Sequence, residues 1–83
     1  MEVTIDKSNI KDYGTKINEQ VTKIIWLAGP LVQSVIDCFP NLNYLDCDYN
    51  RLTNLDALTN CVNLQILDCG YNQLANLNIN SFA

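Results

Sequence analysis

The chain has 83 residues, with a net charge of −4 and no histidine. Hydrophobic residues make up 48% of it and charged residues 17%, with three glycines and two prolines. This length allows one small domain, residues 1–83, and this composition excludes a disordered or collagen-like chain. The acidic charge argues against nucleic acid as a partner, and the lack of histidine excludes imidazole chemistry.

The N-terminal residues 1–7 have neither the basic start nor the continuous apolar segment of a secretory signal. The apolar stretch at residues 24–32 is far shorter than the roughly 20 residues that a membrane-spanning helix needs. We therefore expect an intracellular, cytoplasmic protein that does not enter a membrane. In that compartment the four cysteines are expected to be thiols, and without histidine or a CxxC pair they suggest no structural metal site.

A repeat runs through the chain in four segments. The faint first segment is residues 3–10, and residues 21–31 fit the same frame with a glycine at the asparagine position. Residues 42–52 then show the pattern Leu-x-x-Leu-x-Cys-x-x-Asn-x-Leu, and residues 64–74 repeat it 22 positions later. Such a period predicts stacked repeats, with strand cores near residues 3–5, 24–26, 45–47 and 67–69.

Each repeat is expected to contain one short strand with an apolar and a polar face. In the third repeat Leu45 and Cys47 point inward, while Asp46 between them points outward. A single strand cannot bury its apolar side, but stacking the next repeat about 4.8 Å away pairs the backbones and extends the core. Asn50 and Asn72 fall where the chain turns, so their amides are expected to bond the turn backbone.

The segments between the strands predict short helical pieces. Residues 32–41 and 53–63 have room only for a single turn or a 3₁₀-helix, while residues 11–20 are expected to be more helical. In these segments Cys61 is expected to point inward and Cys38 to be more exposed. Trp26 is expected to fill the core, and the Gly29–Pro30 pair to reshape its turn.

The pattern resembles the leucine-rich repeat family, whose L-x-x-L-x-L-x-x-N/C-x-L motif is matched from Leu42 to Leu52 and from Leu64 to Leu74. The resemblance implies an α/β solenoid with a parallel strand ladder on the concave face. Turns with short 3₁₀ or helical segments would form the convex face. It also implies a binding module and not an enzyme, with no catalytic residues and no cofactor. We therefore expect a non-catalytic protein–protein interaction module.

The outward strand positions line the concave surface and are the candidate partner site. Tyr49 is expected to stack on Tyr71, and the two tyrosines either bind a partner or merely shield the turn. The nearby aspartates either face a basic partner or form a solvated row, and their spacing matches no calcium loop. The predicted partner-binding residues are Tyr44, Asp46, Asp48, Tyr49, Ile66, Asp68 and Tyr71.

Two further features suggest an alternative function. Ile25 and Leu27 are expected to form an exposed apolar strip with Ile66 and Tyr44. In addition, neither end shows a polar cap, since the first strand begins by residue 3 and only residues 80–83 follow the last apolar position. Uncapped ends are expected in a chain that self-associates end to end, in one whose partner completes the stack, or in one cut from a longer repeat protein. We favour the first, so the alternative function is an assembly protein that self-associates into an oligomer through its terminal repeats.

Overall fold

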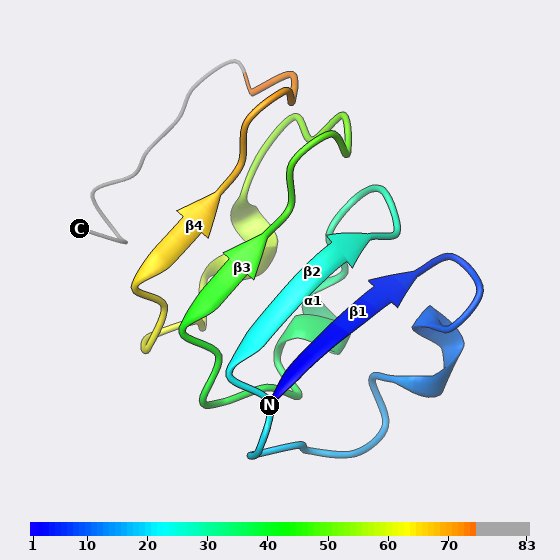
Figure 1. Cartoon of the computed structure of the whole chain (residues 1–83), viewed down its shortest axis with the longest axis vertical. Coiled ribbons are helices and arrows are strands. Elements are labelled where there is room, and N and C mark those ends of the chain that lie inside the picture. Colours follow the sequence, from blue (N-terminus) through cyan, green and yellow to red (C-terminus); the bar gives the residue numbers. More distant parts are fainter. Residues whose placement is uncertain (75–83) are drawn as a thin grey trace.

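The computed structural model describes residues 1–74, and these form a single parallel sheet of four strands (Figure 1). The strands pair in the order β1-β2-β3-β4, each parallel to the next. The predicted parallel strand ladder is confirmed, and each predicted strand core overlaps one strand. Their bounds are β1 (Glu2–Asp6), β2 (Lys23–Leu27), β3 (Tyr44–Asp46) and β4 (Ile66–Asp68).

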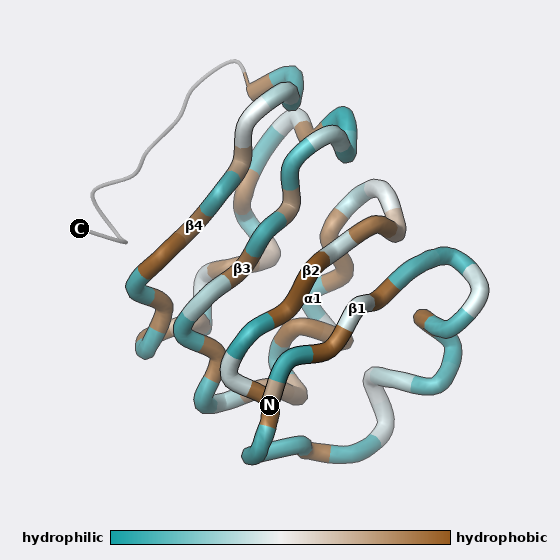
Figure 2. The backbone as a smooth tube through the Cα atoms, in the orientation of Figure 1, coloured by the Kyte–Doolittle hydropathy of each residue, from teal (hydrophilic) through white to brown (hydrophobic). Residues whose placement is uncertain are grey.

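The strands pair in the register that the repeat predicts. Ile24 of β2 lies between Val3 of β1 and Leu45 of β3, and Leu45 pairs in turn with Leu67 of β4. Because alternate side chains project to opposite faces, these residues form one apolar row along the inner face. Figure 2 shows hydrophobic and hydrophilic residues alternating along β1, whereas β2 and β4 have adjacent hydrophobic residues.

Short helical segments follow the first three strands: those at residues 33–36 and 56–58 lie behind the sheet, and the one at residues 10–12 lies beside β1 (Figure 1). They are η1 (Ile10–Asp12), α1 (Gln33–Ile36) and η2 (Asp56–Leu58), of which η1 and η2 are 3₁₀-helices. The predicted single-turn pieces in the second and third repeats are thus confirmed. Within residues 1–74, no helix has the length and apolar character needed to cross a bilayer.

The prediction that residues 11–20 are more helical is wrong. Helical structure in this region ends with η1, and the chain continues through bends and turns. Tyr13 is extended, and Gly14 has a φ of +97°, which lies outside the helical region. The helix therefore ends after three residues.

The core lies between the sheet and the helical segments. Trp26 is completely buried, as predicted for an inward strand position. The expectation that Cys38 is the more exposed cysteine is wrong, because Cys38 is buried, whereas Cys61 is half-buried and packs against the core as expected. The helical turn of α1 explains the burial of Cys38, since it brings Val35 and Cys38, three positions apart, onto the same inward side.

Asparagine side chains satisfy the backbone of the turns after the strands, as predicted. The buried Asn50 donates from Nδ2 to the carbonyl oxygens of Cys47 and Asp48 in its own repeat and of Trp26 in the repeat before it. Asn72 repeats this pattern one repeat later, and its Oδ1 accepts from the backbone N–H of Asn50. Each asparagine therefore ties its own turn to the preceding repeat.

The second repeat has no asparagine at this position and forms its turn differently. Gly29 has a φ of +84° there, a conformation that favours glycine. Its carbonyl oxygen accepts a 2.8 Å hydrogen bond from Trp26 Nε1, and its N–H donates to Asn50 Oδ1. The expected reshaping of the turn at Gly29 is confirmed. The Trp26 indole N–H donates a hydrogen bond to the turn backbone, as an asparagine amide does in the later repeats.

A second set of asparagines, which the sequence analysis missed, links the repeats just before the strands. Asn41 Nδ2 donates to the carbonyl oxygen of Glu19, and Asn63 Nδ2 donates to that of Pro40, both at 2.9 Å. The signal was present, because these two asparagines are themselves 22 residues apart. As at the turns, each side chain bonds the repeat before its own.

The outer edge of β1 is partly closed by a side chain. In a parallel pair, alternate residues direct their backbone groups to opposite edges. Met1 O accepts from Thr22 N–H beside β2, so Thr4 and Asp6 present theirs at the outer edge. There Asn9 Nδ2 donates to Thr4 O and Asn9 Oδ1 accepts from Asp6 N–H, both at 2.9 Å. β1 therefore remains an edge strand, as expected, but two of its outward backbone groups are occupied, and the expected open C-terminal end lies outside the described residues.

Candidate interaction surface

We call the sheet face that the helical segments leave uncovered the open face. Four of the seven predicted partner-binding residues lie on its strands, namely Tyr44, Asp46, Ile66 and Asp68. The other three lie in the turns that follow β3 and β4, namely Asp48, Tyr49 and Tyr71. The structure thus brings all seven onto two neighbouring repeats.

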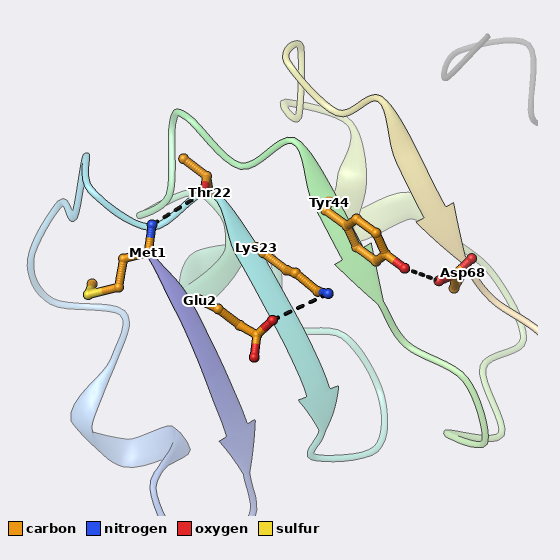
Figure 3. Close-up of polar contacts among 6 residues, drawn as sticks. All are labelled: Met1, Glu2, Thr22, Lys23, Tyr44 and Asp68. Carbon is orange, nitrogen blue, oxygen red and sulfur yellow. Dashed lines mark hydrogen bonds and ion pairs between the residues drawn. The ribbon is translucent and has the colours of Figure 1, made fainter.

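A row of polar contacts crosses the open face from β1 to β4 (Figure 3). Lys23 Nζ lies 3.3 Å from Glu2 Oε1 and 4.3 Å from the centroid of the Tyr44 ring. The Tyr44 hydroxyl then donates a 2.6 Å hydrogen bond to Asp68 Oδ2. Lys23 therefore belongs to this surface, although it was not among the predicted residues. The Tyr44 side chain lies along the sheet, in contact with a residue of each neighbouring strand.

The hydrogen bond to Asp68 raises the pKa of the Tyr44 hydroxyl above its ordinary value of about 10, and partial burial and the charge of Asp46 add to the effect. The folded chain therefore keeps a proton that the unfolded chain loses above pH ~10. This contribution to stability is complete below that pH, and it disappears as the pH rises through the pKa of Tyr44 in the folded state.

Above pH ~10, we expect the free energy of unfolding to fall less steeply with pH in Tyr44→Phe than in wild type, because the variant has no phenol at this position to titrate. Urea unfolding at pH 7, 10 and 11, together with phenolate absorbance, would measure this. Asp68→Asn serves as the matched variant, since it removes the carboxylate that raises the pKa. Identical pH dependence in wild type and both variants would contradict the assignment.

The three aspartates on this surface are oriented by local hydrogen bonds. Asp46 Oδ1 accepts from the backbone N–H of Asp48 at 3.2 Å, and Asp48 Oδ1 accepts from the N–H of Gly70 in the next repeat. With Asp68 held by Tyr44, each carboxylate has one oxygen in a defined contact. In the part of the chain that the structure describes, no three potential ligands are grouped closely enough to hold a metal ion.

Tyr49 and Tyr71 stack as the repeat predicts. Their ring centroids are 4.3 Å apart and their planes differ by 4°. Both residues have a left-handed backbone, with φ values of 60° and 54°, which is uncommon for bulky side chains. Their exposed fractions are 71% and 76%, so both side chains are largely accessible to solvent.

The expected apolar strip is not continuous. Ile25 pairs in register with Asp46, so a carboxylate-bearing residue follows it on the next strand. Ile66 is exposed beside Tyr44 on one side of that position, and Leu27 is exposed on the other. The register therefore divides the apolar residues into two small groups.

An open groove that the sequence analysis did not predict lies beside Tyr49. Its apolar lining comes from Leu27 and Pro30, and two cationic residues, Lys7 and Arg51, also line it. The available signal was the repeat itself, because Lys7 is at the position that Tyr49 occupies two repeats later. Its contact with the groove could not be inferred without the path of the turns.

The cysteines of the third and fourth repeats are poor nucleophiles. Burial raises the pKa of Cys47 to about 12 and that of Cys61 to about 11. Burial also raises the pKa of Cys69. These thiols are therefore protonated near neutral pH, whereas nucleophilic attack requires a thiolate.

Comparison with protein families matches residues 40–81 to the description "Leucine Rich repeats (2 copies)". No curated protein and no solved structure matches the chain. The matched residues make up just over half of the sequence and include β3, β4 and both turn asparagines. With the parallel sheet and its repeating register, this match shows that the chain belongs to the leucine-rich repeat family.

Proposed function

We propose that this chain is a non-catalytic interaction module whose protein partner binds the open face over the third and fourth repeats. Leucine-rich repeats generally mediate protein–protein interactions and are generally not enzymatic. The proposed contact residues are Tyr44, Asp46, Asp48, Tyr49, Ile66, Asp68 and Tyr71.

The observation that carries the proposal is the pairing of three carboxylates with two stacked, exposed tyrosines on adjacent repeats. Within residues 1–74, none of Asp46, Asp48 and Asp68 forms an ion pair. Lys23, which lies on the same face, pairs with Glu2. The charge of Lys23 is balanced by Glu2, so the three carboxylates leave an excess of negative charge, which favours a basic partner surface. Tyrosine adds contact area and a polar tip at little cost in conformational entropy.

The chemistry of the described residues supports a non-catalytic function. The thiols of Cys47, Cys61 and Cys69 have raised pKa values, and the chain has no histidine to deprotonate them. The carboxylates lie on an open surface, whereas general acid catalysis by a carboxyl group relies on an enclosed, water-poor cleft. Binding is therefore the function that this surface supports best.

Self-association through the ends of the stack is the alternative, and it has weaker support. The Asn9 side chain occupies two backbone groups at the outer edge of β1, where an added strand would have to bond. Light scattering over a hundredfold concentration range would separate the two functions. A mass that rises with concentration favours assembly, and a constant monomer mass favours binding of another protein.

The test of the proposed function is selection of binders from a random peptide library on the wild-type chain. We expect the selected peptides to be enriched in Lys and Arg. The double variant Asp46→Asn, Asp68→Asn should bind these peptides about tenfold more weakly, because charge pairs across the interface are lost. The control Asp12→Asn, Asp56→Asn removes the same charge from exposed positions outside the open face, and should change binding less than about twofold. Peptides without basic residues, or equal effects of both double variants, would refute the proposal.

A further inference from the structure

The column of stacked tyrosines stops at Tyr49. The equivalent positions in the four repeats are Lys7, Ala28, Tyr49 and Tyr71. Tyr71 covers one ring face of Tyr49 at a centroid distance of 4.3 Å. In the second repeat Ala28 offers only a methyl group, which packs against the core. Within residues 1–74, no aromatic side chain of the second repeat stacks on Tyr49, and Tyr49 itself lines the groove.

The groove has an apolar lining and open space next to the ring. Leu27, which lines it, is 54% exposed, and Pro30 is exposed as well. A β-carbon added at Gly29 would meet no other heavy atom within 4 Å, so this side of the groove is unfilled. A planar apolar group placed there would contact Tyr49 on one side and the turn of the second repeat on the other.

The charged residues at this groove have the sign opposite to that of the whole chain. Lys7 and Arg51 line it and are exposed, and neither forms an ion pair with any of residues 1–74. Asp6, next to Lys7, is engaged elsewhere, because its Oδ1 accepts from the N–H and the hydroxyl of Ser8 and from the N–H of Asn9. Two cations in a chain of net charge −4 are therefore available to an anionic group.

We propose that this groove binds an aromatic side chain of a partner protein that has carboxylates on the neighbouring residues. The ring stacks on the open face of Tyr49, and the carboxylates pair with Lys7 and Arg51. An aliphatic side chain would fill the space without stacking, and an uncharged segment would leave both cations unpaired. Because Tyr71 already holds the Tyr49 ring in place, little conformational freedom is lost on binding.

This inference extends the proposed function, on which it rests for the premise that a protein partner meets this side of the molecule. It adds a subsite of opposite charge to the aspartates of the open face. The two sites require different residues in the partner. Basic residues would bind at Asp46 and Asp68, and an aromatic residue flanked by acidic residues would bind at Tyr49. Their failures can therefore be told apart by separate peptides.

The experiment is a titration of ¹⁵N-labelled chain with the probe N-acetyl-Asp-Tyr-Glu-amide, followed by NMR. We expect shifts at the backbone amides of Gly29, Asn50 and Arg51, and weaker binding as salt increases. Replacing the probe's tyrosine with leucine, or its acids with their amides, should each weaken binding by about fivefold.

The variants Tyr49→Asn and Arg51→Asn test the protein side, because asparagine tolerates the left-handed backbone found at both positions. Each variant should bind the probe about five- to tenfold more weakly than wild type. Tyr49→Phe keeps the stacking ring and should bind the probe nearly as tightly as wild type. Lys7→Gln should act like Arg51→Asn. Lys16→Gln removes an exposed cation outside this groove and is the matched control.

Absence of shifts at the groove amides would overturn the inference, and so would equal binding of the leucine probe or equal effects of Lys16→Gln and Arg51→Asn. The double variant Asp46→Asn, Asp68→Asn should leave this probe bound. If that variant also leaves the basic peptides bound, the proposed function fails while the groove stands. If the basic peptides depend on the aspartates and this probe does not bind, only the groove fails.

Discussion

Replacing Trp26 with alanine is expected to lower the free energy of unfolding by about 3–5 kcal/mol, the range for large aromatic side chains in a core. Trp26 is 0% exposed and belongs to the hydrophobic core cluster. The substitution also removes the hydrogen bond to Gly29 O. A domain of this size has a total stability of about 4–12 kcal/mol, so the loss takes a large share of it.

Urea unfolding followed by far-UV circular dichroism measures this effect without relying on tryptophan fluorescence. Trp26→Phe keeps most of the apolar contact and should cost about 1–2 kcal/mol, through lost volume and the lost indole N–H bond. Leu27→Ala is the control, since Leu27 is the next residue of β2 and is exposed. Equal losses for Trp26→Ala and Leu27→Ala would contradict the buried position.

Replacing Asn50 with alanine is expected to cost about 2–4 kcal/mol, because several buried backbone groups lose their hydrogen-bond partner at once. The Asn50 amide donates to the carbonyl oxygens of Trp26, Cys47 and Asp48, and its oxygen accepts from Gly29 N–H. Alanine can form none of these bonds, and its small volume leaves space where the amide was.

Thermal and urea unfolding would measure this loss against two variants. Asn43→Ala is the control, because Asn43 is exposed and its side chain forms no hydrogen bond within residues 1–74. We expect a change of less than about 0.5 kcal/mol there. Asn50→Asp keeps the acceptor oxygens but replaces the donating NH₂ group and adds a buried charge, so it should be at least as damaging as alanine. If Asn50→Asp were as stable as wild type, the donor role would be wrong.

The fold could be predicted from the sequence because one pattern recurs. Inward apolar positions two residues apart predicted each strand, and the 22-residue offset predicted the register in which Leu45 pairs with Leu67. Asn50 and Asn72 were predicted to hold the turns because they follow each strand at a constant distance. A period carries this information because every repeat must fit the next one.

Features that occur only once could not be predicted in this way. The end of η1 depends on the backbone at Gly14, and the cap on β1 depends on how the chain folds back to place Asn9 at the edge. The burial of Cys38 follows from α1, a helical turn that the third repeat replaces with a 3₁₀-helix. The repeat pattern contains no information about these single events.

The candidate site was predictable in part. The stacking of Tyr49 on Tyr71 follows from their equivalent positions, and the structure confirms it. The contacts of Tyr44 with Lys23 and Asp68 do not follow, because long side chains cross from one row to the next. Register specifies where each Cα lies, but the direction of a long side chain depends on which neighbour its polar end can reach.

The asparagine bonds give the stack a direction. Asn72 forms hydrogen bonds with backbone groups of the third repeat, and Asn50 with those of the second. In the first repeat such a bond comes from its own Asn9. Asn63 likewise bonds the preceding repeat. Removing the fourth repeat would thus leave the third with unpaired backbone groups, while removing the first would leave the second turn intact. Within residues 1–74 the stack is therefore polar, because the turn of a repeat takes asparagine bonds from the repeat that follows it.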